Sequence, residues 1–282
     1  MFKRIRFTFV LFTSVVLSAC AMYLPKPSSQ LSIEEHILLP EVLSETSGLY
    51  CESDKLLSIN DSGNAPVIYQ VEQDGSISKQ YDVALVNNDW EAITANETAF
   101  YIADVGNNNG KREWLSIYKL ERKNLTDIQK IHIKYAGNSV TGNIPYAHDF
   151  DSEAMIKLQD SLVLFSKSWR TGITKVYRIN ESELERTLSP FASISGLPGV
   201  ITGADFDTTR NVFVVVGYKS DPFGNFSAFL AQISQDFTID NVWPLKGYKQ
   251  VEGVCVDTKG HYWFSEEATK GRGASLSKGK IL

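Results

Sequence analysis

The feature that most constrains the fold is a short motif that recurs five times, at intervals of roughly fifty residues. The copies are Ser47-Gly-Leu, Glu91-Ala-Ile, Glu153-Ala-Met, Thr202-Gly-Ala and Glu252-Gly-Val. Each copy opens a short apolar run, which ends in a polar turn and is followed by a second run of β-branched and aromatic residues. A third run and a weaker fourth run follow in most copies. Such runs, bounded by turn residues, predict a four-stranded antiparallel sheet of the size of a propeller blade.

Five such sheets predict an all-β protein, a five-bladed β-propeller over residues 36–282. The fifth unit ends without a fourth strand, while the apolar segment 37–43 stands unassigned before the first unit. We therefore expect an N-terminal strand to complete the last blade and close the ring, which also removes an exposed sheet edge. Six blades are the alternative, because the unit from Glu91 to Glu153 is long. A β-sandwich with an accidental repeat is the other.

In an antiparallel hairpin the second strand ends at the rim where the first began, so each blade offers two residues to one end of the central channel. The first column is Ser47, Glu91, Glu153, Thr202 and Glu252, and the second is Asp61, Asp104, Lys167, Gly217 and Glu266. Six of these ten residues are acidic and Lys167 alone is basic. His148 lies on a loop that we expect nearby.

Clustered carboxylates repel one another unless a cation or shared protons relieve them. Oxygen ligands from several loops suit Ca²⁺ or Mg²⁺, and we expect Glu91, Asp104, Glu153 and Glu252 to be the ligands. Two alternatives stay open at this point. The acids could accept hydrogen bonds between blades, with Lys167 compensating their charge, or they could line a polar ligand pocket without a metal.

Cys51 and Cys255 fall in the first strands of the first and last units, which are neighbours across the closure. Counted from the shared glycine they are one position out of phase, so they point to opposite faces of their own sheets and can meet. A disulfide and two buried free thiols are both compatible with this placement.

The N-terminus predicts export and lipid anchoring. Lys3, Arg4 and Arg6 precede an uncharged run, which suits a signal peptide over residues 1–19 better than a permanent span. The following Leu-Ser-Ala-Cys20 resembles the lipobox of bacterial lipoproteins, which implies cleavage before Cys20 and its acylation. Residues 20–35 then form the lipidated cysteine and a Pro- and Ser-rich tether. Ala21 after the cysteine favours the outer membrane, on its periplasmic face.

Charge limits the partners. Loss of three basic residues with the signal peptide changes the net charge from −5 to −8, and no basic cluster favours nucleic acid. Besides the membrane, reached through its lipid anchor, we expect a monomer that contacts an envelope protein or a small ligand.

Several short motifs resemble the SdiA-regulated and esterase-like phytase group of propellers. They are Glu-Thr-Ser-Gly-Leu from Glu45, Asn60-Asp-Ser-Gly, Asp89-Trp-Glu-Ala-Ile and Ala103-Asp-Val-Gly-Asn. The resemblance implies a propeller, but the asparagine ligands of related lactonases are missing at clear repeat positions. The sequence therefore favours non-catalytic binding at the rim. The alternative is a Ca²⁺- or Mg²⁺-assisted hydrolase of esters or phosphoesters, with His148 or a rim acid as base.

Overall fold

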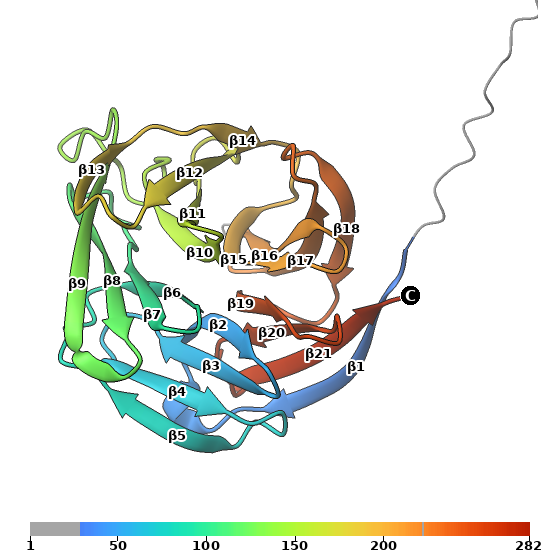
Figure 1. The fold of residues 1–282 in the computed structure, drawn as a ribbon. Coiled ribbons are helices and arrows are strands. Elements are labelled where there is room, and N and C mark those ends of the chain that lie inside the picture. The colour runs from blue at the N-terminus through green and yellow to red at the C-terminus, as the bar shows by residue number, and fades with distance from the viewer. Residues whose placement is uncertain (1–28, 222) are drawn as a thin grey trace, which may run out of the picture.

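The computed structural model describes residues 29–221 and 223–282, in which five sheets surround a central axis (Figure 1). This arrangement confirms the five-bladed propeller. Blade 1 comprises β2 (Thr46–Glu52), β3 (Lys55–Asn60), β4 (Val67–Val71) and β5 (Ile77–Asp82). Blade 2 comprises β6 (Trp90–Ala95), β7 (Ala99–Asp104), β8 (Leu115–Glu121) and β9 (Asn124–Tyr135). Blade 3 comprises β10 (Ser152–Leu158), β11 (Ser161–Ser166), β12 (Thr174–Asn180) and β14 (Ala192–Ile194).

Blade 4 comprises β15 (Val200–Asp207), β16 (Val212–Ser220), β17 (Phe226–Ile233) and β18 (Ile239–Leu245). Blade 5 contains β19 (Val251–Val256), β20 (Tyr262–Glu266), β21 (Ser275–Ile281) and the N-terminal β1 (Leu31–Leu38). β1 pairs antiparallel with β21, from Leu31 opposite Ile281 to Leu38 opposite Ser275 (Figure 1). The closing strand thus begins before residue 36, and the rest of segment 37–43 forms a short 3-10 helix, η1 (Glu41–Leu43), that leads into blade 1.

The long second unit remains one blade. β9 alone is 12 residues long, and residues 136–151 form an excursion above the channel rather than a further sheet. A fifth strand, β13 (Glu185–Leu188), crosses from blade 3 and pairs parallel with β9, with Glu185 opposite His132. This strand was not predicted, because its four residues are largely polar and show no strand pattern.

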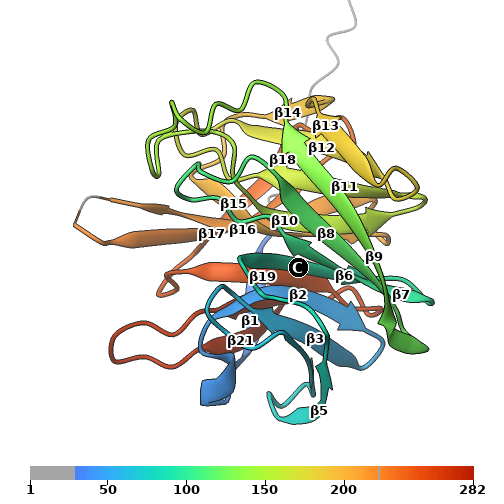
Figure 2. The same ribbon diagram turned by 90° about the vertical axis from the view of Figure 1, so that its left-hand side faces the viewer.

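Every innermost strand carries a β-bulge at the same place. The register shifts fall between residues 46 and 48, 90 and 92, 152 and 154, 201 and 203, and 251 and 253. The bulged residues are therefore Ser47, Glu91, Glu153, Thr202 and Glu252, the whole first column. A bulge adds one unpaired residue and re-aims its side chain. We call this end of the channel the bulge rim; in Figure 2 it lies to the left, where the long loops gather.

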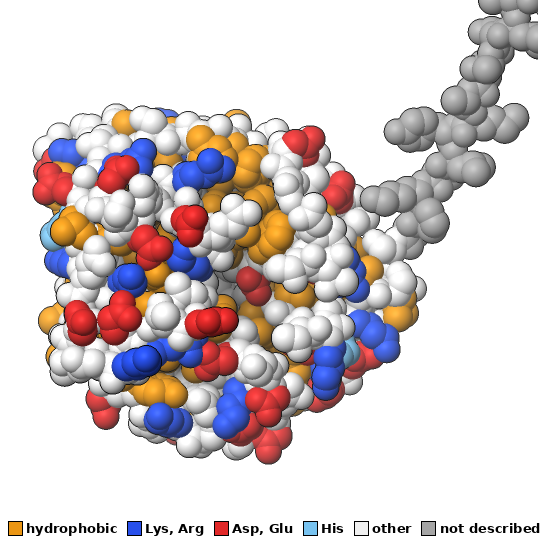
Figure 3. Space-filling view, viewed as in Figure 1, with side chains coloured by type: hydrophobic (Ala, Val, Ile, Leu, Met, Phe, Trp, Pro, Cys, Tyr) orange, Lys and Arg blue, Asp and Glu red, His pale blue; other side chains and the backbone are white. Residues whose placement is uncertain are grey.

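A small residue follows each bulge: Gly48, Ala92, Ala154, Gly203 and Gly253. A Cβ on Gly48 would lie 2.8 Å from the Ile93 nitrogen, so the innermost strands of neighbouring blades approach closely here. The channel accordingly narrows below the rim to a space of about 10 Å³, which is no more than one water fills. At its opposite end it widens again to about 510 Å³, the central hollow of Figure 3.

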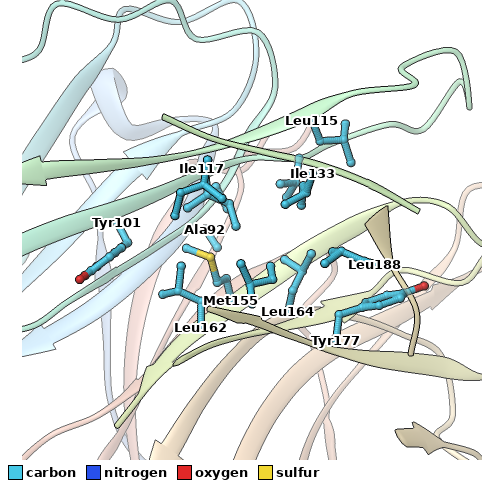
Figure 4. Close-up of a cluster of buried hydrophobic side chains, with 14 of the residues drawn as sticks. Ala92, Tyr101, Leu115, Ile117, Ile133, Met155, Leu162, Leu164, Tyr177 and Leu188 are labelled. Carbon is cyan, nitrogen blue, oxygen red and sulfur yellow. The ribbon is translucent and has the colours of Figure 1, made fainter. Parts of the chain in front are cut away.

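The core consists of five hydrophobic clusters, one at each interface between blades. Figure 4 shows the cluster between blades 2 and 3, where Ala92 and Ile117 face Met155 and Leu164. Full burial of each such aliphatic side chain stabilises the fold by about 1.5–3 kcal/mol. Between blades 1 and 5 the packing is reinforced by a disulfide from Cys51 in β2 to Cys255 in β19, with Cα atoms 5.4 Å apart.

Candidate functional site: an acidic cavity at the bulge rim

The bulge rim encloses a cavity of about 150 Å³ at the mouth of the channel. All five blades contribute to it, together with the excursion 136–151. The lining residues are Ser47, Asp61, Glu91, Asn108, Tyr146, Glu153, Lys167, Trp169, Tyr218, Glu252 and Glu267. The repeat thus brings together side chains that are more than two hundred residues apart in the sequence.

The residues of the second predicted column occupy two successive strand positions, whose side chains point to opposite faces of the sheet. Asp104, Gly217 and Glu266 pair directly with the residues before the bulges, and they do not line the cavity. Asp61 and Lys167 lie one residue further along, where side chains point to the opposite face. At that later position blades 4 and 5 carry Tyr218 and Glu267, which do line the cavity.

Asp104, which we predicted as a metal ligand, is instead bound to groups of its own blade. It is fully buried, accepts a hydrogen bond from Asn88 at 2.8 Å and forms an ion pair with Arg112. Glu266 likewise pairs with Arg272 at 2.9 Å and accepts the Lys249 amide at 2.6 Å. Both acids therefore have a structural role within their own blades and adjoining loops, not between blades as the sequence left open.

The two hydroxyl residues of the first column join neighbouring blades. Ser47 Oγ donates to the Trp90 carbonyl at 2.7 Å, and Thr202 Oγ1 donates to the Val251 carbonyl. Trp90 and Val251 are the residues just before the bulge of the next blade, so the two contacts are equivalent. The longer glutamates at the other bulges extend toward the cavity instead.

Glu91, Glu153 and Glu252 are nearly buried, with exposed fractions of 5%, 3% and 7%. Lys167 forms an ion pair with one oxygen of Glu153, and the other oxygen, Oε2, has no hydrogen-bond partner in the described residues. Glu91 takes part in no hydrogen bond or ion pair found in that same part of the chain. An unpaired buried carboxylate oxygen is costly, so Glu153 Oε2 and the cavity-facing carboxylate of Glu91 are favourable positions for an added cation.

Burial and mutual repulsion raise the pKa values throughout the cavity. Loss of hydration raises the pKa of Glu252 to about 8, and the charges of Glu267 and Asp61 add to the effect. The pKa of Glu267 also rises to about 8, mainly through burial and the Asp61 charge. The pKa of Asp61 rises to about 6 through burial, and that of Glu91 rises through burial and the Glu153 charge. Near neutral pH several of these acids therefore hold protons, which a bound cation would displace.

The arrangement that best fits a metal is the triad Asp61, Asp89 and Glu91, each of which offers an oxygen within 4.8 Å of the others. Asp89 lies beside the cavity, 4.0 Å from Arg112. Gly106 is necessary for this grouping, because a Cβ there would lie 2.2 Å from a Glu91 oxygen and 2.4 Å from an Asp89 oxygen. Three carboxylates from two blades match the oxygen preference of Ca²⁺ and Mg²⁺.

Asp89 is the member of this triad that was not predicted from the sequence as a site residue. It lies in the loop before β6, two residues ahead of the bulge, and belongs to no column. The motif Asp89-Trp-Glu-Ala-Ile did contain it, and a carboxylate spaced by two from the bulged Glu91 was the available signal.

His148, the predicted base, does not line the cavity. Its Nδ1 accepts the Phe150 amide at 3.1 Å, and its Nε2 lies 3.2 Å from the Asn108 carbonyl. Both ring nitrogens thus hold the excursion in place.

Aromatic rings complete the mouth of the cavity. Trp169 and Tyr146 contact each other edge to face, with ring centroids 5.4 Å apart, and Trp169 Nε1 donates to Asp151 at 3.0 Å. Trp90 and Trp263 are fully buried core residues, in agreement with a packing role. Trp169 differs from them because its ring is only half-buried and borders the cavity.

The predicted signal peptide, Cys20 and most of the tether lie outside the described residues. Within the part that is described, no helix is long and apolar enough to cross a membrane.

Comparisons with known proteins give a fold likeness and no family. No protein-family model matches the chain, and no curated protein matches it significantly in sequence. The virginiamycin B lyase structure from Staphylococcus aureus shares 16% identity at a TM-score of 0.43, covering 87% of this chain and 69% of that one. A protein of unknown function from Bacteroides caccae shares 10% identity at a TM-score of 0.45, covering 78% and 69%. At these scores the likeness carries no argument about this chain. Its sheet order defines a five-bladed β-propeller, and membership of the SdiA-regulated group stays a prediction.

Proposed function

We propose that the protein is a non-catalytic outer-membrane lipoprotein, anchored through Cys20, whose bulge rim binds a small ligand or an envelope partner with the help of a divalent cation. Asp61, Asp89 and Glu91 would hold the cation. Ca²⁺ is the better candidate than Mg²⁺, because the triad comes from two different blades and Mg²⁺ demands a stricter octahedron.

The observation that carries this proposal is the state of Glu91. The residue is 5% exposed, and its carboxylate borders the cavity near other acids without a hydrogen-bonding partner among the described residues. A structural glutamate at this bulge would make the contact that Ser47 and Thr202 make to the next blade. Glu91 is instead left available to a ligand.

We favour a binding function because His148, one of the two kinds of base that the sequence suggested, uses both ring nitrogens within its own loop. A rim acid stays as the other candidate base. A metal in the triad would still polarise a bound ligand, and hydrolysis of ester or phosphoester substrates is therefore the outcome to watch for in control assays.

The test is calorimetric titration of the purified mature chain with Ca²⁺ and Mg²⁺ at pH 8, after treatment with a chelator. We expect saturable binding near one ion per chain and a higher melting temperature with the ion than without it. Asp89→Asn and Glu91→Gln should each abolish binding, whereas Glu113→Gln, on the outer surface, should not change it. Failure of all ions to bind would remove the metal from the proposal.

The anchor is tested separately by Cys20→Ser. We expect the protein to leave the membrane fraction, because acyl chains and not the propeller provide stable attachment. A variant that stays membrane-bound would contradict the lipoprotein assignment.

A further inference from the structure

The ammonium group of Lys167 lies among aromatic rings at the mouth of the cavity. Its Nζ is 4.8 Å from the centre of the Trp169 ring and 5.4 Å from that of Tyr218. It also approaches the Tyr218 hydroxyl at 3.3 Å and forms the ion pair with Glu153. Ring faces and carboxylates together stabilise an ammonium ion. The contacts of Lys167 thus show that this part of the cavity accommodates an ammonium group.

Lys167 does not match the charge that surrounds it. Five carboxylates line the cavity, namely those of Asp61, Glu91, Glu153, Glu252 and Glu267, against one ammonium. When all are ionised, the sum is −5 + 1 = −4, and a divalent ion leaves −2. The free Oε2 of the buried Glu153 and the carboxylate of Glu252 line the same cavity but are not part of the metal triad. Positive charge is therefore still needed beside these two residues.

A second pocket of about 280 Å³ adjoins the cavity, and Trp169 and Tyr218 line both. Its wall includes Leu197 and Pro198 from the segment that leads into β15, Val200 at the start of β15, and Lys219. The wall offers no carboxylate, and its side formed by Leu197, Pro198 and Val200 suits an uncharged apolar group. A ligand that spans both spaces would place charge in the first and an organic body in the second.

We infer that the ligand of the bulge rim is an organic primary ammonium compound, with its charged end between Glu153 and Glu252 and its apolar body across Trp169 in the adjoining pocket. This inference rests on the proposed binding function of the same cavity and names its ligand class. An anionic ligand would meet the uncompensated carboxylates, and a neutral polyol would leave the charge unmatched.

The experiment uses two probes with the same body, phenethylamine and 2-phenylethanol, titrated into the Ca²⁺-loaded mature chain at pH 8. Binding is followed by calorimetry and by Trp169 fluorescence, with Trp169→Phe as the control for the signal. We expect saturable binding of the amine and at least roughly tenfold weaker binding of the alcohol, because the alcohol lacks the charge-assisted hydrogen bonds.

Glu252→Gln should weaken the amine roughly tenfold and Ca²⁺ binding far less, because Glu252 lines the cavity but is not part of the triad. Glu113→Gln makes the same charge change on the outer surface and should alter neither. Unchanged circular dichroism would show that each variant is folded.

The outcomes separate the two ideas. Equal affinity for the amine and the alcohol would overturn the ammonium inference. An unchanged affinity for the amine in Glu252→Gln would overturn it as well. Ca²⁺ binding without any response to the amine would overturn it too, yet leave the proposed metal-dependent function standing. If neither Ca²⁺ nor the amine binds, both proposals fail.

Discussion

Acidic residues line both ends of the channel, five at the bulge rim and three at the far end, but their hydrogen bonding differs. At the far end, Asp207 accepts hydrogen bonds from Tyr262 at 2.8 Å and from the Thr209 amide at 3.0 Å. Asp257 there accepts the His261 and Lys259 amides at 2.9 Å each. At the bulge rim, Oε2 of Glu153 is buried with no such partner among the described residues, and Glu91 borders the cavity. Acidic composition alone therefore indicates no site, whereas acids that face a cavity without hydrogen-bond partners do.

The difference also shows in the direction of the pKa shifts. Hydrogen bonds lower the pKa of Asp207 and of Asp257 against the opposing effect of burial. At the rim, burial raises the pKa values of Glu91, Glu252 and Glu267. Asp205 is the exception at the far end, because burial raises its pKa to about 6 despite two amide bonds of 2.7 Å.

The largest effect should come from Lys167→Met. The substitution keeps the length of the stem but leaves Glu153 buried without its cation, and such breaks cost about 3–5 kcal/mol of unfolding free energy. The far end supplies the matched control, Arg210→Met. Asp207 would keep its tyrosine and amide donors, so we expect a loss below about 1 kcal/mol. Urea unfolding at pH 8 measures both. Similar losses for the two variants would remove the contrast between the two ends.

The disulfide at the far end should rank next. Cys51 and Cys255 are 204 residues apart in the sequence and join the first blade to the last. Replacing both by alanine removes a constraint on the unfolded chain, which then gains conformational entropy. The unfolding free energy should fall by about 2–4 kcal/mol. A free-thiol count of zero on unfolded, unreduced protein is the accompanying check. Because the link is remote from the rim, Ca²⁺ affinity should stay unchanged, and a parallel loss of affinity would contradict the independence of the two ends.

The ends should also respond to pH in opposite directions. The folded-state pKa values of Glu252 and Glu267, about 8, exceed their ordinary value of 4.5, so the folded protein holds protons that the unfolded chain releases. Their contribution to stability is complete below about pH 4.5 and is lost as the pH rises toward about 8. Asp207 and Asp257 have lowered pKa values, so their contribution is present above their ordinary pKa of 3.8 and is lost as the pH falls below it.

We therefore expect the metal-free protein to lose several kcal/mol of unfolding free energy between pH 5 and pH 8, because each unit of pKa shift is worth about 1.4 kcal/mol. Glu252→Gln should flatten this slope, and Ca²⁺ should restore the stability at pH 8. The measurement is urea unfolding across this range. A stability that rises with pH over the same interval would show that the rim acids are ionised and paired in the folded protein.

The sequence predicted more of the fold than of the site, and the reason lies in strand periodicity. The repeat located every bulged residue, because the apolar runs after Ser47, Glu91, Glu153, Thr202 and Glu252 align without gaps. It misplaced the second column for two reasons. The hairpin of blade 2 is as long as those of blades 1 and 3, and Asp104 stands one residue before the position equivalent to Asp61 and Lys167. The hairpins of blades 4 and 5 are longer, so Gly217 and Glu266 also fall one residue short, and one residue of slip reverses the face. β13 was missed for a different reason. Its pairing with β9 is a long-range contact, and its four largely polar residues carry no pattern that predicts a strand.

The smallest predicted effect tests whether the bulged residues are of two kinds, those that bond to the next blade and those that are available to a ligand. Thr202 Oγ1 donates to the Val251 carbonyl, so Thr202→Val keeps the shape and removes the donor, at a cost of about 1 kcal/mol. Thr202→Ser keeps the donor and should cost less. At the equivalent position of blade 2, Glu91→Gln should raise the stability of the metal-free protein, because it removes one of several repelling charges. Thermal unfolding at pH 8 compares the three variants. If Glu91→Gln destabilised the protein as Thr202→Val does, Glu91 would also be a residue that joins neighbouring blades. The proposal that the rim is a binding site would then be wrong.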